Sequence, residues 1–209
     1  MQWIQADKPV AQFIFAHGAG AGIDSGFMQE IAKLMAQQGV SVGLFDFPYM
    51  QRAKAENKRR PPDRADKLLA SFNDALSSAM QGLPLFIGGK SMGGRMASML
   101  VAQSDSEMVA SVGGIIAFGY PFHPPGKKDK LRVAHFGDIN VPFCVIQGER
   151  DTFGKQDELS LLADTSPAVI HWLADGDHSL VPRKKSGISQ EQNWQQAADI
   201  AVAFIKEQV

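Results

Sequence analysis

Short apolar runs alternate with longer amphipathic segments along most of this chain, and this alternation restricts the folds that it can adopt. The runs are rich in β-branched and aromatic residues, which is typical of buried strands. Because the runs are almost continuously apolar, we expect a parallel sheet whose two faces are both covered. The predicted strands are residues 11–16, 41–47, 84–88, 111–118, 141–147 and 168–173.

Helical patterns lie between these strands. In one of them, apolar residues from Leu68 to Met80 recur at four-residue spacing and form a single stripe. Repeated strand-then-helix order implies right-handed crossovers and an α/β, doubly wound, mostly parallel sheet of about six to seven strands. Ligands bind such sheets at the carboxyl ends of the strands, so the residues after each strand are the candidates for function. The predicted helices are residues 27–38, 64–80, 92–101 and a last helix from about residue 190.

The bulk composition limits the class of protein. A chain of 209 residues with 44% hydrophobic and 21% charged residues fits one soluble domain over residues 1–209. The net charge of −1 gives no sign of a nucleic-acid or membrane partner, and no apolar run reaches the ~20 residues of a membrane span. The N-terminus lacks the pattern of a secretory signal, and Cys144 is the only cysteine. We therefore expect a reducing, cytoplasmic location.

The segment between the third predicted strand and the following helix contains a candidate nucleophile. Gly89, Ser91 and Gly93 satisfy the pattern G-x-S-x-G, which is weak evidence alone because it is short. A nucleophile elbow requires a strand, a sharp turn and a helix in this order, and all three are predicted here. Ser91 would then be the nucleophile, and the backbone N–H of Met92 would donate to the oxyanion.

Two other interpretations of this segment are possible. A phosphate-binding P-loop is excluded, because it requires glycine where Pro84 stands. The remaining alternative, that Ser91 only caps the helix that follows it, stays open at this point.

Two further strand ends supply an acid and a base. Asp151 follows the strand 141–147, and His178 follows the strand 168–173, in the chain order serine, acid, histidine. A histidine there can accept the serine proton, while an acid behind it fixes the tautomer. Each residue alone could be an ordinary loop residue, but their joint register with Ser91 favours catalysis. Asp175 and Asp177 are rival acids, although they lie too close to His178 in sequence to approach it from a different strand.

The first predicted strand ends in a glycine-rich turn with the sequence HGAGAG. Such a turn exposes backbone N–H groups, and we expect Ala19 to supply the second oxyanion donor, with Gly18 and Gly20 shaping the turn. The turn does not fit a dinucleotide fingerprint, which requires glycine where Ile23 stands. His17 is expected to be buried and structural. The histidines are scattered, so we expect neither a metal site nor a cofactor.

Basic residues are concentrated in segments 51–64, 126–132 and 183–185, which contain only three acids. Each segment follows a strand end, so we expect a positive rim around the site and, as a hypothesis, an ester or thioester substrate with a phosphate or carboxylate. Ordinary solvated loop charge is the open alternative. Tyr49, Phe122 and His123 lie at the same edge and could contact substrate, although core packing accounts for each equally well. Few aromatic residues interleave with the charges, which argues against stacking on nucleic acid.

Several stretches together resemble a known family: HGAGAG, FDFPYM, RRPPD, GGKSMGGR, GYPFHPPGK, QGERDTFG and DGDHS. They are similar to a compact α/β-hydrolase family related to dienelactone hydrolases, to testis-expressed protein 30 and to the third subunit of the animal non-specific lethal complex. The resemblance implies an α/β-hydrolase fold and the same catalytic and oxyanion residues. The larger superfamily often inserts a helical lid before the acid. Here only about 30 residues separate the strand 111–118 from Asp151, and another strand occupies part of them, so we expect no large lid. Dienelactone hydrolases use cysteine where Ser91 stands, so their particular chemistry does not carry over.

The sequence therefore predicts a serine hydrolase that cleaves a small ester or thioester through an acyl-serine intermediate. Peptidase activity is less favoured, because the chain has no specificity domain. A non-catalytic binding or scaffold module that retains the fold is the alternative, since fold does not determine function. The sequence does not specify the acyl group, the leaving group or the oligomeric state.

Overall fold

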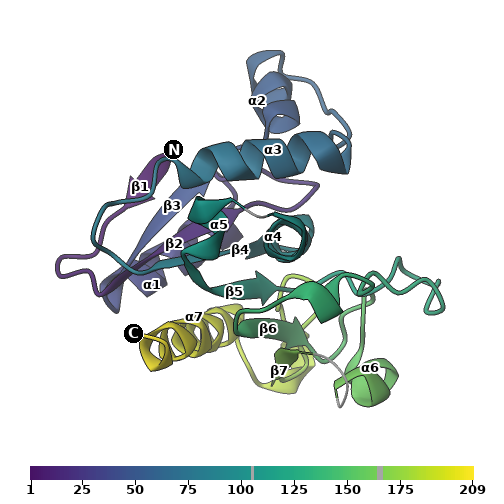
Figure 1. Cartoon of the computed structure of the whole chain (residues 1–209). Coiled ribbons are helices and arrows are strands. Elements are labelled where there is room, and N and C mark those ends of the chain that lie inside the picture. The colour runs from purple at the N-terminus through teal and green to yellow at the C-terminus, as the bar shows by residue number, and fades with distance from the viewer. Residues whose placement is uncertain (105, 164–166) are drawn as a thin grey trace.

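The computed structural model describes residues 1–104, 106–163 and 167–209. Within them, seven strands form one sheet in the order β1-β3-β2-β4-β5-β6-β7, and all pairs except β1–β3 are parallel (Figure 1). The doubly wound, mostly parallel sheet predicted from the sequence is confirmed. The strands are β1 (Gln2–Ile4), β2 (Ala11–Ala16), β3 (Val40–Phe45), β4 (Leu85–Lys90), β5 (Val112–Phe118), β6 (Phe143–Gly148) and β7 (Ala168–Leu173).

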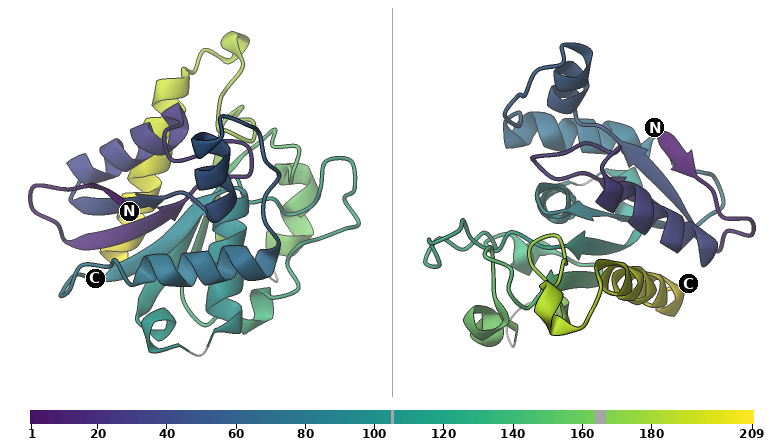
Figure 2. Two further views of the ribbon diagram at one scale, coloured as in Figure 1. Left: turned by 90° about the horizontal axis from the view of Figure 1, so that it is seen from above. Right: turned by 180° about the vertical axis from the view of Figure 1, so that it is seen from behind.

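Helices cover both faces of the sheet. Helices α1 and α7 pack side by side on one face, while α3 and α4 cover the other (Figures 1 and 2). The four predicted helices are present, and the structure adds three that the sequence analysis did not predict: α2, α5 and α6. The helices are α1 (Gly26–Gln37), α2 (Pro48–Ala55), α3 (Ala65–Leu76), α4 (Met92–Gln103), α5 (Glu107–Ala110), α6 (Gln156–Ala163) and α7 (Gln190–Glu207), with short 3-10 helices η1 (Phe136–Asp138) and η2 (Lys184–Ser186).

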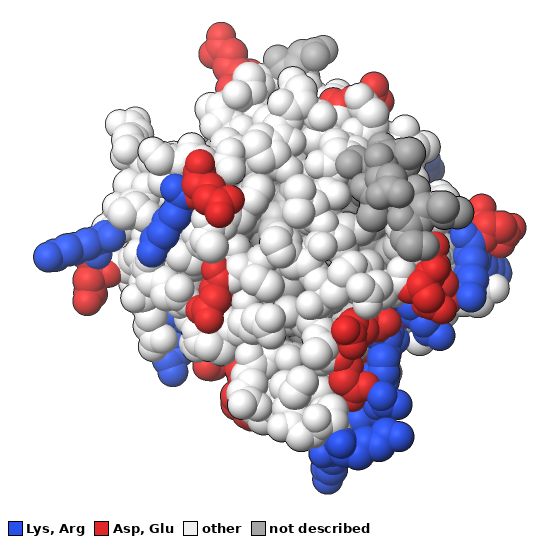
Figure 3. Space-filling model, turned by 90° about the horizontal axis from the view of Figure 1, so that it is seen from below, with Lys and Arg blue, Asp and Glu red and all other residues white. Residues whose placement is uncertain are grey.

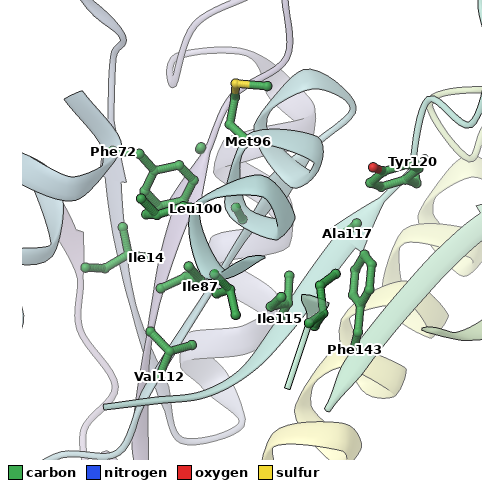
Figure 4. Packing of buried hydrophobic residues seen from close by; sticks show 14 of the residues in the cluster. Ile14, Phe72, Ile87, Met96, Leu100, Val112, Ile115, Ala117, Tyr120 and Phe143 are labelled. Carbon is green, nitrogen blue, oxygen red and sulfur yellow. The ribbon is translucent and has the colours of Figure 1, made fainter. Parts of the chain in front are cut away.

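The core consists of two layers, one on each face of the sheet. Phe72 and Leu100 belong to the layer under α3 and α4, where Figure 4 shows them beside Ile87. Phe13 and Phe15 belong to the opposite layer, under α1 and α7. Successive strand side chains point to opposite faces, and here both faces are buried. This arrangement explains why the strand sequences are continuously apolar rather than alternating.

The strand order reverses its direction between β2 and β4. The chain leaves β2 toward β3 on one side and later continues from β4 toward β5 on the other side. Such a reversal of strand order is where open α/β sheets bind ligands. Between β5 and β6, the described residues 119–142 contain only η1, so no large lid is inserted there. In the part of the chain that is described, no helix is long and apolar enough to cross a membrane.

The close packing of β4 against β5 can be tested with two glycines. A side chain at Gly88 would overlap the backbone carbonyl of Ile116 on β5, whereas a side chain at Gly26 would meet nothing within 4 Å. We expect Gly88→Ala to lower the free energy of unfolding by about 3 kcal/mol, because a strand must shift to make room. Gly26→Ala, at the start of α1, should change it by less than about 1 kcal/mol. Urea unfolding measures both, and equal losses would contradict the β4–β5 packing.

Candidate active site

Ser91 forms a strained turn between β4 and α4. Its φ of 51° and ψ of −112° lie outside the regions that non-glycine residues ordinarily adopt. Its N–H donates to the carbonyl of Phe118 at 2.9 Å, which holds the turn against the end of β5. A Cβ at Gly89 would come within 2.6 Å of the Ala16 carbonyl oxygen, and a Cβ at Gly93 would overlap that same oxygen. The two glycines of the motif are therefore required by the close approach of β2.

His178 and Asp151 connect to Ser91 through hydrogen bonds. The His178 Nε2 lies 2.8 Å from the Ser91 Oγ, and its Nδ1 lies 2.8 Å from the Asp151 Oδ2. The fully buried Asp151 carboxylate can only accept, so the Nδ1 carries the proton and the Nε2 is free to accept from the serine hydroxyl. The structure thus brings together the three side chains that follow β4, β6 and β7.

Two residues that the sequence analysis did not select support this arrangement. Gln147, the last side chain of β6 before its final glycine, is buried and donates from Nε2 to the Asp151 Oδ2 at 2.8 Å. The Phe153 N–H donates to the Asp151 Oδ1 at 2.8 Å, and its ring packs on the His178 ring with centroids 4.2 Å apart. Gln147 is a polar residue at the end of an otherwise apolar strand, and this position could have marked it as a candidate site residue. No sequence signal marked Phe153.

The glycine-rich turn after β2 is held by its own carbonyl groups. The Tyr49 hydroxyl donates to the carbonyls of Gly18 and Ala19, at 3.2 Å and 3.0 Å. Because C=O and N–H point in opposite directions across a trans peptide, the N–H groups of Ala19 and Gly20 point away from Tyr49. Met92 opens α4, so its N–H has no partner within the helix. The two predicted donors, Met92 and Ala19, therefore belong to segments that adjoin Ser91.

His17 is buried and structural, as the sequence analysis expected. Its Nε2 accepts from the Phe47 N–H at 3.0 Å, so its Nδ1 carries the proton and donates to the Gly18 carbonyl at 2.7 Å. Burial lowers the pKa of the imidazole, which keeps it neutral.

A cavity of about 410 Å³ lies in front of Ser91, and we call it the serine cavity. Its walls are largely apolar. The lining residues are Gly18, Ala19, Gly20, Ala21, Ser25, Phe27, Met28, Lys90, Ser91, Phe153, His178 and Ser179.

Three residues predicted to contact substrate are not part of this lining. Tyr49 is buried beneath the turn that it binds, and burial raises the pKa of its phenol, which keeps it a donor. Phe122 packs in the core against Tyr120, with ring centroids 4.9 Å apart. The buried His123 contacts the Pro124 carbonyl and Glu158. The core-packing alternative describes all three positions.

Lys90, the last residue of β4, was not among the candidate site residues predicted from the sequence. It lines the serine cavity but is buried, and its ammonium group donates to the backbone carbonyl of His178. Burial lowers its pKa to about 8, although the charges of Asp151 and Asp177 oppose this shift. The ammonium also lies 5.5 Å from the centre of the Phe27 ring, within the range of a cation–π contact.

The rival acids have other partners. Asp175 pairs with Arg183 and Arg150, and its hydrogen bonds to Arg183 are the main cause that lowers its pKa to about 2. The Asp177 Oδ1 accepts from the backbone N–H groups of Ser179 and Val181, at 2.8 Å and 3.0 Å. Asp177 therefore shapes the loop that carries His178, and neither acid is hydrogen-bonded to the imidazole.

The basic segments are less positive in the structure than in the sequence, because acids from other segments pair with them. Lys54 pairs with Asp24 and Asp46, and Lys128 pairs with Glu158. Figure 3 shows the face on which α6 and α7 lie, where basic and acidic side chains are intermixed along one edge and the centre carries few charges.

Among the described residues, no cluster of three or more His, Cys, Asp or Glu side chains could hold a metal.

The chain is similar to known proteins both in sequence and in structure. A family model of the alpha/beta hydrolase domain matches residues 9–206. A dienelactone hydrolase from Anabaena variabilis is 16% identical, with a TM-score of 0.72 over 99% of this chain and 90% of that one. Est1E from Butyrivibrio proteoclasticus with ferulic acid bound is 11% identical, with a TM-score of 0.70 over 99% and 94%. An esterase domain from Rhodothermus marinus is 16% identical, with a TM-score of 0.66 over 98% and 91%. At these identities the structures share the fold.

The buried lysine predicts an unusual dependence of stability on pH. Lys90 titrates at about 8 in the folded state and near 10.5 in the unfolded chain. Between these values the unfolded state holds a proton that the folded state lacks, so the free energy of unfolding rises with pH. Below pH 8 the buried ammonium costs about 3 kcal/mol. We expect the stability of the wild type relative to Lys90→Met to rise from pH 7.5 to pH 10 in urea unfolding. A constant difference would contradict the burial of a charged Lys90.

Proposed function

This chain belongs to the alpha/beta hydrolase domain family, and from that premise we propose that it is a serine hydrolase that cleaves an ester or thioester through an acyl-serine intermediate. The observation that carries the proposal is the continuous hydrogen-bonded series from Ser91 through His178 to the buried Asp151. Two of the similar structures are described as a dienelactone hydrolase and an esterase domain, and a third contains ferulic acid, which supports ester chemistry.

In the proposed reaction, the Ser91 Oγ attacks the substrate carbonyl while its proton passes to the His178 Nε2. Asp151 stabilises the imidazolium that results. The N–H groups of Met92 and Ala19 would donate to the oxyanion of the tetrahedral intermediate. The imidazolium then gives its proton to the leaving alcohol or thiol as the acyl–oxygen or acyl–sulfur bond breaks. A water molecule, deprotonated by His178, attacks the acyl-serine, and the serine recovers its proton when the acid departs.

The proposal extends to the substrate and the location of the protein. The small, largely apolar serine cavity suits a small-molecule acyl group, and basic residues nearby favour an anionic substrate. A single cysteine, Cys144, allows no disulfide within the chain, and we place the protein in the reducing cytoplasm on that ground. The narrower relation to testis-expressed protein 30 and to the non-specific lethal complex stays a prediction.

The activated serine can be tested by covalent labelling. We expect a fluorophosphonate probe to form a stoichiometric adduct on Ser91, because His178 increases its nucleophilicity. Intact-protein and peptide mass spectrometry locate the adduct. Ser91→Ala and His178→Ala should abolish labelling, whereas Ser25→Ala, in the same cavity, should retain it. A folded protein that does not label would favour the non-catalytic binding module instead.

The choice of Asp151 as the acid can be tested against its rival. We expect Asp151→Asn to lower kcat by ~10⁴-fold, because the amide NH2 can donate to Nδ1 and favour the tautomer with its proton on Nε2, and because a neutral amide does not stabilise the imidazolium. Asp175→Asn should leave kcat within about threefold of the wild type, because Asp175 pairs with arginines outside this series. Steady-state hydrolysis of an activated ester measures both variants. Equal losses would overturn the assignment of the acid.

A further inference from the structure

A second depression adjoins the serine cavity, and we call it the basic groove. It has a volume of about 560 Å³ and shares Ala19 and Gly20 with the serine cavity. The two hollows therefore adjoin at the turn whose N–H groups would bind the oxyanion. The lining residues of the basic groove are Ala19, Gly20, Asp24, Met50, Ala53, Lys54, Asn57, Lys58, Arg59 and Arg60.

The charge of the basic groove is not balanced by its own acids. Asp24 is the only acid in the lining, against four basic side chains. Lys54 pairs with Asp24 at 3.2 Å, and Arg60 pairs with Glu56 at 2.5 Å. Within the part of the chain that the structure describes, neither Lys58 nor Arg59 forms an ion pair. The groove thus presents two uncompensated cations in a concavity, which attracts anions.

Local hydrogen bonds fix the backbone that carries these two cations. Two residues after the end of α2, Asn57 adopts the left-handed conformation, at a φ of 49°. The Asn57 N–H donates to the Lys54 carbonyl, and the Lys58 N–H donates to the Ala53 carbonyl at 2.9 Å. This pair of bonds is a Schellman motif, which reverses the chain against the end of its helix. The motif therefore fixes how the chain leaves α2 toward residues 58–60, which line the groove.

A further connection joins the groove to the turn after β2. The Asp46 Oδ1 accepts from the Ile23 N–H at 3.0 Å, while its Oδ2 accepts from the Lys54 ammonium at 2.6 Å. Because Ile23 follows the glycine-rich turn and Lys54 lies on α2, Asp46 holds the two walls together. The groove is therefore formed before any ligand binds.

The two hollows differ in chemistry. Phe27, Met28 and Phe153 line the serine cavity, whereas the groove is cationic. The carbonyl carbon under attack must lie between Ser91 and the oxyanion donors, which is near the junction of the two hollows. A substrate that occupies both must have an apolar part and an anionic part on opposite sides of its scissile bond.

The order in which the products leave indicates which part of the substrate is the acyl group and which is the leaving group. The acyl group stays on Ser91 after the first step, while the alcohol or thiol must leave before water attacks. The side chains of Lys58 and Arg59 are exposed, so a group bound there can depart directly into solvent. Two uncompensated cations in one groove suit a multiply charged group such as a phosphate better than a single carboxylate.

We propose that the substrate is an ester or thioester of an apolar acid with a phosphate-bearing alcohol or thiol, and that Lys58 and Arg59 bind its phosphate. This inference rests on the proposed hydrolase function. It goes beyond a general preference for anions, because it assigns the charge to the leaving group and names the residues that receive it.

Two thioesters of the same acid test the proposal. Butyryl-coenzyme A carries phosphates on its leaving group, and butyryl-N-acetylcysteamine has the same thioester without them. We expect the wild-type kcat/KM to be at least ~10-fold higher for the phosphorylated thioester, which corresponds to about one charge-assisted hydrogen bond. In Lys58→Ala/Arg59→Ala this ratio should fall to about one, and in Lys58→Glu/Arg59→Glu below one.

The controls separate the possible failures. Lys33→Ala removes a cation from α1 in a different hollow and should retain the wild-type ratio. Raising the salt concentration should lower the ratio of the wild type and leave that of the double alanine variant unchanged. If neither thioester is cleaved, the proposed hydrolase function fails. If the wild type cleaves both equally, or the double variant loses both equally, the hydrolase function stands and the phosphate-binding groove is overturned.

Discussion

The carbonyl of Ala16, at the carboxyl end of β2, lies where side chains at Gly89 and Gly93 would have to be. This close backbone contact lets β2, β4 and the first turn of α4 meet without intervening side chains. Ser91 can then hold a conformation that is costly for a residue with a Cβ, because the neighbouring backbone leaves it no alternative. The glycine-rich turn continues directly from β2, so the same contact also sets its distance from Ser91.

Two charged groups are buried at the site. Asp151 is fully buried, yet each of its oxygens accepts a hydrogen bond, from Gln147 and His178 on one side and from Phe153 on the other. A buried carboxylate is tolerated only when it is paired in this way. Lys90 differs from Asp151, because burial lowers its pKa and so disfavours its charged form. Its ammonium group nevertheless donates to the backbone carbonyl of His178. The burial of Lys90 in its charged form therefore lowers the free energy of unfolding.

Sequence reasoning predicted most of the fold because the strands are buried on both faces, which leaves an unmistakable apolar signal. It missed β1, a three-residue edge strand whose Trp3 packs over Gly43, because so short a segment has no periodicity. It grouped Ser91, Asp151 and His178 correctly in space, since parallel strand ends share one edge. It could not tell that Tyr49 points inward, because a residue after a strand can face either the core or the crevice. It also overstated the positive rim, because Asp24, Asp46 and Glu158 reach the basic segments only through the fold.

Asp46 shows how such long-range partners connect the parts of the site. It follows β3, the strand beside β2, and one of its oxygens binds the loop after the glycine-rich turn while the other binds α2. A displacement of α2 would therefore pull on the backbone that carries the proposed oxyanion donor. Tyr49, near the start of α2, makes a second connection to the same turn. An anion bound by residues that follow α2 and an oxyanion bound by the turn would thus act on one rigid unit, so binding energy from the leaving group can contribute to stabilising the transition state.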